Sequence, residues 1–261
     1  VYDWQLGRVI SSPVAKLDSV LTSSWNFYNS GSYSLNVYYR AATSLFTLER
    51  LLGEKTWARI MRTYHQRYRF KHPRTEDFIQ VVNEVSGQDL NWFFQEFFYA
   101  AKDFDYAISS VETRIKPEKY RGIFDDLPTV SPEHDRETTN QTAVSKKDKS
   151  RQKIYETIIT LRRYGEIMLA PGYNLKLKVE FEDGSIDWKE WDGQSRWVRF
   201  YFEKPVRVKR AVLDPDGLWL VDTNLSNNSY ARRGPTTKIM SVTTGLFWLV
   251  QNMLITMSSW L

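Results

Sequence analysis

Residues 38–53 read YYRAATSLFTLERLLG, and this stretch decides the first element of the fold. Its apolar residues recur at spacings of three and four: Ala41, Leu45, Leu48, Leu51 and Leu52. That spacing places one apolar stripe along a helix. Gly53 follows the stripe, and glycine commonly ends a helix in the left-handed conformation. The stretch therefore predicts an amphipathic helix that ends at Gly53.

Helical periodicity continues to about residue 98. A second apolar stripe is formed by Trp57, Ile60, Met61 and Tyr64. His72-Pro73 interrupts the pattern, because the proline ring clashes with a preceding helical turn. Thr75, followed by two acidic residues, then predicts a capping hydroxyl and a new helix that Gly87 ends. Residues 90–98, which are dense in Phe, predict a last short helix.

The apolar period changes from 3.6 to 2 near Asp105. Segments rich in β-branched and aromatic residues follow at 106–111, 154–163, 174–181, 186–191, 197–202 and 206–213. Glu182-Asp183-Gly184 is typical of a tight hairpin turn between two of them. Six or seven short strands with this spacing predict an antiparallel β-sandwich. The sequence therefore predicts an α+β fold.

We expect three regions in the chain. Residues 1–104 form the helical part, and residues 105–235 form the sandwich, with a polar insertion at 117–153. Residues 236–261 form a terminal apolar helix, which has no charged residue after Lys238. Its many Ser, Thr, Asn and Gln side chains favour docking on protein over lying at or crossing a bilayer. Membrane association through residues 239–261 stays open, so the sequence leaves a cytoplasmic or a membrane-associated location undecided.

Composition excludes several kinds of site. The chain has no Cys, which removes disulfides, thiolate nucleophiles and Cys-based zinc sites. The formal net charge is +5, and much of the excess lies in residues 146–153. That segment lacks the aromatic and glycine interleaving of a nucleic-acid surface, so we expect a solvated loop and no nucleic-acid partner.

The histidines do not form a metal motif. His65, His72 and His134 are the three histidines, and none belongs to an HExxH pattern. We expect each to lie on the surface or to cap an element, and we expect no metal ligand in this chain. Nucleophile elbows, phosphate loops and dinucleotide fingerprints are likewise missing from the sequence.

The order of several motifs resembles the C-terminal part of gluzincin zinc aminopeptidases, the family of membrane alanyl aminopeptidase. Residues 38–42, YYRAA, resemble a Tyr-x-Lys-Gly-Ala segment that opens a helix ending in Leu-Gly, here Leu52-Gly53. The matching residues that follow are Tyr64, Tyr68, Phe70, Thr75-Glu76-Asp77-Phe78, Gly87, Asp89, Leu90, Trp92, Phe93 and Phe94. Further motifs resemble the sandwich after the catalytic domain in some bacterial members: Trp191-Asp192-Gly193, Trp197, Asp214-Pro215-Asp216 and Asn227-Asn228.

The resemblance implies a specific chemistry. Residues 1–104 would be the helical C-terminal half of a thermolysin-like catalytic domain. Zinc would be bound by ligands upstream of this chain, and the whole protein would release N-terminal residues from peptides. Matching the segments places the tyrosine that stabilises the oxyanion at Tyr38, with Tyr39 as the alternative; simple packing is the other interpretation of both. Arg40 replaces the usual Lys and Ala41 the usual Gly.

The resemblance also implies a longer protein. The apolar residues Tyr2, Trp4 and Leu6 follow Val1 at once, so we expect this chain to be the C-terminal part of a zinc peptidase. Its partners would be a peptide substrate and the rest of the catalytic domain, and the isolated chain would be inactive. If the whole protein has lost the zinc motif, we expect a non-catalytic protein-interaction or membrane-associated module instead.

Overall fold

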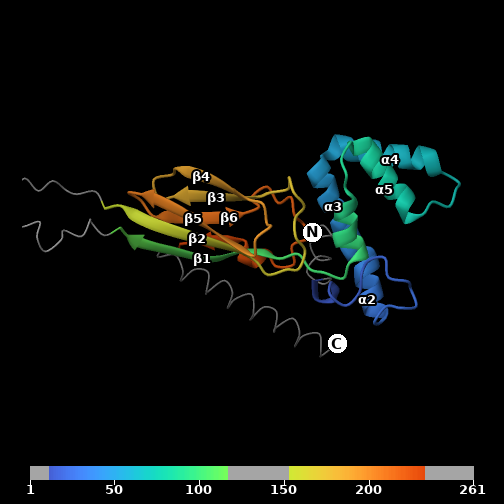
Figure 1. Cartoon of the computed structure of the whole chain (residues 1–261), viewed down its shortest axis with the longest axis horizontal. Coiled ribbons are helices and arrows are strands. Elements are labelled where there is room, and N and C mark those ends of the chain that lie inside the picture. Colours follow the sequence, from blue (N-terminus) through green and yellow to red (C-terminus); the bar gives the residue numbers. More distant parts are fainter. Residues whose placement is uncertain (1–11, 117–152, 233–261) are drawn as a thin grey trace, which may run out of the picture.

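The computed structural model describes residues 12–116 and 153–232 of the 261-residue chain. A helical part up to about residue 104 and a part built of β-strands lie end to end (Figure 1). The predicted α+β class is confirmed. The predicted terminal helix at 236–261 and the predicted insertion at 117–153, apart from Lys153, lie outside the described residues.

The helical part is a succession of short elements. In chain order these are η1 (Ser12–Val14), α2 (Ser30–Ser34), η2 (Leu35–Arg40), α3 (Ala41–Leu52), α4 (Glu54–Tyr68), α5 (Thr75–Ser86), α6 (Asn91–Phe94) and η3 (Gln95–Tyr99). Both η2 and η3 are π-helical. The helix predicted over 90–98 is therefore divided into an α-helical and a π-helical turn. Across the described ranges, no helix has both the length and the apolar character needed to cross a membrane.

Two helix ends differ from the prediction. Gly53 ends α3 with a φ of 80°, as expected, but its ψ of 148° lies far from the left-handed helical value of about 47°. Thr75 is the first residue of α5 rather than its cap. The cap is Arg74, whose backbone N–H donates to the Asp77 carboxylate at 2.7 Å. The Asp77 carboxylate thus reaches back to the backbone N–H of the cap residue, which is a different donor from the first-turn N–H groups that a capping threonine hydroxyl would serve.

The β part is a sandwich of two antiparallel sheets, as predicted. The first sheet has the order β1 (Tyr106–Ile115), β2 (Tyr155–Arg163), β5 (Trp197–Lys204). The second has the order β4 (Ile186–Trp191), β3 (Leu175–Phe181), β6 (Val208–Leu213), β7 (Ser229–Ala231), with η4 (Leu225–Asn227) before its last strand. β3 and β4 are joined by the predicted tight turn, in which the Gly184 N–H donates to the Phe181 carbonyl at 3.0 Å.

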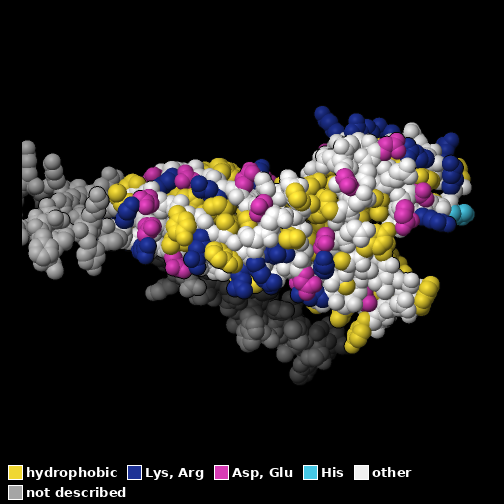
Figure 2. All heavy atoms as spheres, viewed as in Figure 1, with side chains coloured by type: hydrophobic (Ala, Val, Ile, Leu, Met, Phe, Trp, Pro, Cys, Tyr) yellow, Lys and Arg dark blue, Asp and Glu magenta, His cyan; other side chains and the backbone are white. Residues whose placement is uncertain are grey.

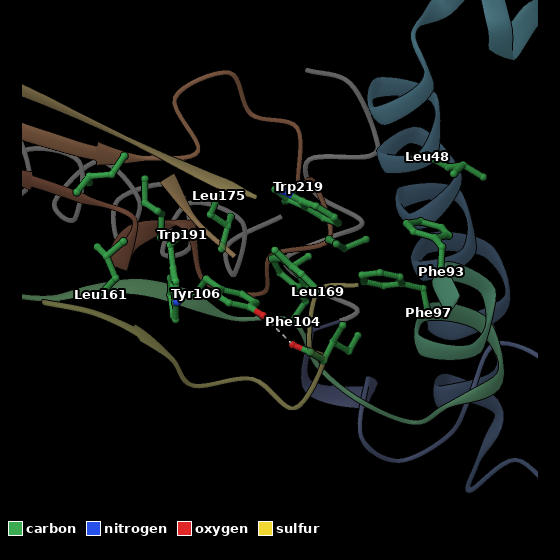
Figure 3. Packing of buried hydrophobic residues seen from close by; sticks show 14 of the residues in the cluster. Leu48, Phe93, Phe97, Phe104, Tyr106, Leu161, Leu169, Leu175, Trp191 and Trp219 are labelled. Atoms are coloured by element: carbon green, nitrogen blue, oxygen red, sulfur yellow. Dashed lines mark hydrogen bonds between the residues drawn. The ribbon is translucent and has the colours of Figure 1, made fainter. Parts of the chain in front are cut away.

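A continuous line of buried aromatic rings joins the helical part to the sandwich (Figure 3). Phe93 and Phe97 from the last helical turns pack with ring centroids 4.6 Å apart. Phe97 contacts Phe104 in the connecting segment at 6.0 Å, and Phe104 stacks on Trp219 at 5.2 Å. Burial of such large rings contributes strongly to stability, so this line fixes the helical part on the sandwich.

Candidate functional site

Tyr38 and Tyr39 lie on the π-helical segment η2, between α2 and α3. A π-helical turn inserts a residue into the α-helical repeat, and such turns are frequent at functional sites. The side chain of Tyr38 is 62% exposed and that of Tyr39 is 38% exposed. Both candidates therefore reach the surface, with Tyr38 the more accessible.

The ring of Tyr38 packs against a neighbouring aromatic ring. Its centroid lies 6.3 Å from that of Tyr33 in an edge-to-face arrangement, and Tyr33 contacts Phe27 in the same way at 5.2 Å. Within residues 12–116 and 153–232, the Tyr38 hydroxyl has no hydrogen-bond partner. The Tyr38 ring thus packs against Tyr33 on one side, and its hydroxyl forms no hydrogen bond with a described residue.

Three polar side chains form the buried side of the same helical region. Ser32, Asn36 and Arg40 recur every four residues and are 1%, 0% and 8% exposed. The Asn36 Nδ2 group donates to the Ser32 carbonyl at 3.1 Å and to its Oγ at 3.2 Å. The Ser32 hydroxyl donates in turn to the carboxylate of Asp18, which also accepts from the Tyr28 backbone N–H. These bonds tie α2 and η2 to the preceding loop.

The guanidinium of Arg40 connects segments that are far apart in the sequence. Its Nη1 donates to the carbonyls of Ala15 at 3.0 Å and Asp18 at 3.2 Å. Its Nη2 donates to the carbonyls of Lys102 at 2.6 Å and Ala100 at 3.4 Å. One side chain thereby joins η2 to the N-terminal loop and to the segment that leads into the sandwich.

Burial also changes the acidity of Arg40. Loss of hydration lowers the pKa of Arg40 to about 10, against the opposing attraction of Asp103. A guanidinium with a pKa of about 10 is still charged at neutral pH. Arg40 therefore donates to its carbonyl acceptors as a cation, which strengthens each hydrogen bond.

The structure brings no metal ligands to Tyr38 from the described residues. His65 on α4 and His72 before α5 are both exposed, and His134 lies outside the described ranges. In the part of the chain that the structure describes, no group of three or more His, Cys, Asp or Glu side chains could hold a metal ion. The predicted roles of Tyr38 and Tyr39 stay predictions.

The buried anchor of the site is not predicted from the sequence. There Arg40 stands out only as a replacement for the usual Lys, and Ser32, Asn36 and Asp18 are not singled out. The spacing of four between Ser32, Asn36 and Arg40 was a usable signal, because polar residues at this spacing share one face of a helix. The carbonyl acceptors of Arg40 left no signal, since every residue has a carbonyl group.

Comparison with known proteins gives a limited result. No family model matches the chain, and no curated protein matches it. Among solved structures, the chain is similar to the crystal structure of Legionella pneumophila aminopeptidase A in complex with aspartic acid, with a TM-score of 0.40 and 12% sequence identity. The similarity covers 80% of this chain and 20% of that chain. A likeness of this degree defines neither a family nor an activity.

Proposed function

We propose that this chain is part of a zinc-dependent metallopeptidase of the aminopeptidase type, and that Tyr38 stabilises the oxyanion formed during peptide hydrolysis. The proposal rests on the match of the YYRAA segment, residues 38–42, with the order of motifs that follows it. The observation that carries it is the exposed Tyr38 phenol on a π-helical turn whose opposite side is buried and anchored by Arg40.

A tyrosine hydroxyl suits this role. When water adds to a peptide carbonyl, negative charge develops on the carbonyl oxygen, and a neutral O–H placed there lowers the energy of the transition state. A phenol is neutral at pH 7 and donates one hydrogen bond without bringing a competing charge. In the proposed mechanism Tyr38 keeps its proton and donates that bond to the oxyanion.

Rigidity of the donor matters as much as its chemistry. A donor that is already placed needs no reorganisation during the reaction, and this is the source of most electrostatic catalysis. The bonds of Arg40 to the Ala15 and Lys102 carbonyls fix the turn that carries Tyr38. In the proposed enzyme this anchor would keep the phenol in position.

The zinc site would come from the remainder of the proposed protein. The described residues do not fit a zinc site, so no step is assigned to the metal within this chain. When bound, zinc would supply polarisation of the carbonyl and activation of water. The peptide substrate would be held between that region and the Tyr38 side of η2.

The proposal is tested by assaying the longest protein that contains this chain for release of N-terminal residues from short peptides. We expect activity that is lost with a zinc chelator and restored by added zinc. A protein with neither bound zinc nor peptidase activity would contradict the proposal and would favour the non-catalytic interaction module.

A further inference from the structure

We propose that the outer face of strands β2 and β5 is a binding surface for anionic phospholipid headgroups. The surface, here called the arginine–aromatic face, consists of Arg162, Tyr164, Trp197, Arg199 and Tyr201. The proposal is separate from peptidase activity and involves none of the residues around Tyr38.

The strand register brings these side chains together. Arg162 on β2 is the direct cross-strand partner of Trp197 on β5. Alternate residues of a strand share one side of the sheet, so Trp197, Arg199 and Tyr201 follow one another along the outer side of β5. Phe202, on the opposite side, is buried at 4% exposure. The face therefore lies on the solvent side of the sheet.

Each arginine of the face lies over an aromatic ring. The Arg162 guanidinium carbon lies 5.1 Å from the centroid of the Tyr164 ring, and that of Arg199 lies 5.1 Å from the Trp197 ring. The stacked arrangement orients a guanidinium while leaving N–H groups at its edge to bind an anion. Both arginines are thus placed to bind a phosphate group.

The aromatic side chains of the face are well exposed. Trp197 is 53% exposed, Tyr201 is 60% exposed and Tyr164 is 44% exposed. Figure 2 shows hydrophobic side chains beside Lys and Arg side chains on the sandwich. Trp and Tyr combine an apolar ring with a polar group, which suits the boundary between headgroups and acyl chains.

The cations of the face are not neutralised by neighbouring acids. Within the described ranges, Arg162, Arg199 and the exposed Arg196 just before β5 form no ion pair. Cations elsewhere on the sandwich do: Arg114 with Glu156, Lys116 with Glu203, Lys204 with Asp187 and Lys209 with Glu180. The positive charge at this end of the sheet is therefore available to an anionic partner.

A lipid surface fits this combination better than an acidic protein segment. The face lies on the solvent side of two neighbouring strands, and a planar headgroup layer can contact Trp197, Tyr201 and both arginines at once. Cations near an anionic bilayer each add binding free energy, while the exposed rings enter the interface. The complementary occupant is thus a bilayer that contains anionic phospholipid.

The test is co-sedimentation of the full 261-residue chain with phosphatidylcholine vesicles, with and without phosphatidylserine. We expect binding that requires phosphatidylserine and weakens with salt. The double variant Arg162→Gln, Arg199→Gln should lower the partition coefficient by about 25-fold, the product of about fivefold for each arginine. Trp197→Ala should weaken binding without changing the charge.

The control is the double variant Arg114→Gln, Lys116→Gln, which removes the same charge from the other end of the same sheet, where the cations are paired. It should bind as the wild type does, and thermal unfolding should show that all variants are folded. Equal binding to vesicles with and without phosphatidylserine would overturn the proposal, because the apolar residues 239–261 would then be enough to explain the binding. Absence of binding, or full binding by the Arg162→Gln, Arg199→Gln variant, would also overturn it and leave an acidic protein segment as the partner of the face.

Discussion

Tyr38 and Arg40 are two residues apart on one π-helical turn and project to opposite sides of it. Tyr38 is 62% exposed, whereas Arg40 is 8% exposed and donates to carbonyls of two distant segments. Residues two apart on a helix do not face each other. Arg40 and Tyr38 therefore lie on one turn but on different sides of it. A substitution of one side chain leaves the other side chain in place.

Replacing Arg40 is expected to destabilise the fold. Arg40→Met removes every donor to the Ala15, Asp18 and Lys102 carbonyls, and each buried acceptor left unpaired costs free energy. We expect a loss of roughly 3 kcal/mol in the free energy of unfolding, measured by urea denaturation. Arg40→Lys should lose less, because the ammonium retains the charge but reaches fewer acceptors.

The matched control is Arg62→Met on α4, where the arginine is exposed. An exposed substitution of this kind usually changes stability by less than about 0.5 kcal/mol. Equal stability of the Arg40→Met and Arg62→Met variants would show that Arg40 is not an anchor.

Asp222 is expected to make stability depend on pH. Burial raises the pKa of Asp222 to about 7, although the Asn228 side chain and the Asn224 backbone N–H donate to its carboxylate. A raised carboxyl pKa stabilises the folded state most below the unfolded pKa of about 3.9. This stabilisation is lost as the pH rises through 4 to 7, by up to about 4 kcal/mol.

Asp222→Asn should remove that dependence. The Asn228 side chain can accept from the new amide, because its Oδ1 has no hydrogen-bond partner among the described residues. We expect the variant to gain stability relative to the wild type between pH 4 and pH 8, as measured by chemical denaturation at each pH. Asp192→Asn, at an exposed site, should follow the wild type, and parallel curves for Asp222→Asn and the wild type would contradict the assignment.

Phe104 is expected to couple the helical part to the sandwich. Its ring is 1% exposed and contacts Phe97, Tyr106 and Trp219. Phe104→Ala would leave a cavity at the junction, and we expect a loss of about 3–5 kcal/mol in the free energy of unfolding. Phe70→Ala is the matched control, because Phe70 is 100% exposed and loses no packing. Similar losses for the two variants would rule out a special role for the junction.

The periodicity of the sequence predicted the regular elements well. The stripe that includes Leu48 became α3, and the segment 186–191, predicted from its β-branched and aromatic residues, became β4 at the same boundaries. The helix prediction succeeds because the spacing of apolar residues marks the buried side of a helix. The strand prediction succeeds because residues of these types favour strands.

Interactions between distant segments could not be predicted in the same way. The distant acceptors of Arg40 are backbone carbonyls at positions 15, 18, 100 and 102, and carbonyl groups carry no sequence signature. The π-helical turn at residues 35–40 depends on one additional residue per turn, which periodicity does not resolve. The raised pKa of Asp222 likewise depends on burial at the junction rather than on its sequence neighbours.

The most direct test of the proposed function is peptide hydrolysis by the longest protein that contains this chain, wild type beside Tyr38→Phe and Tyr39→Phe, with zinc content measured in each. We expect that Tyr38→Phe keeps its zinc and loses about 10²- to 10³-fold in kcat, the usual effect of removing one oxyanion donor, while Tyr39→Phe keeps its activity. Full activity of a zinc-loaded Tyr38→Phe enzyme would contradict the proposed role of Tyr38.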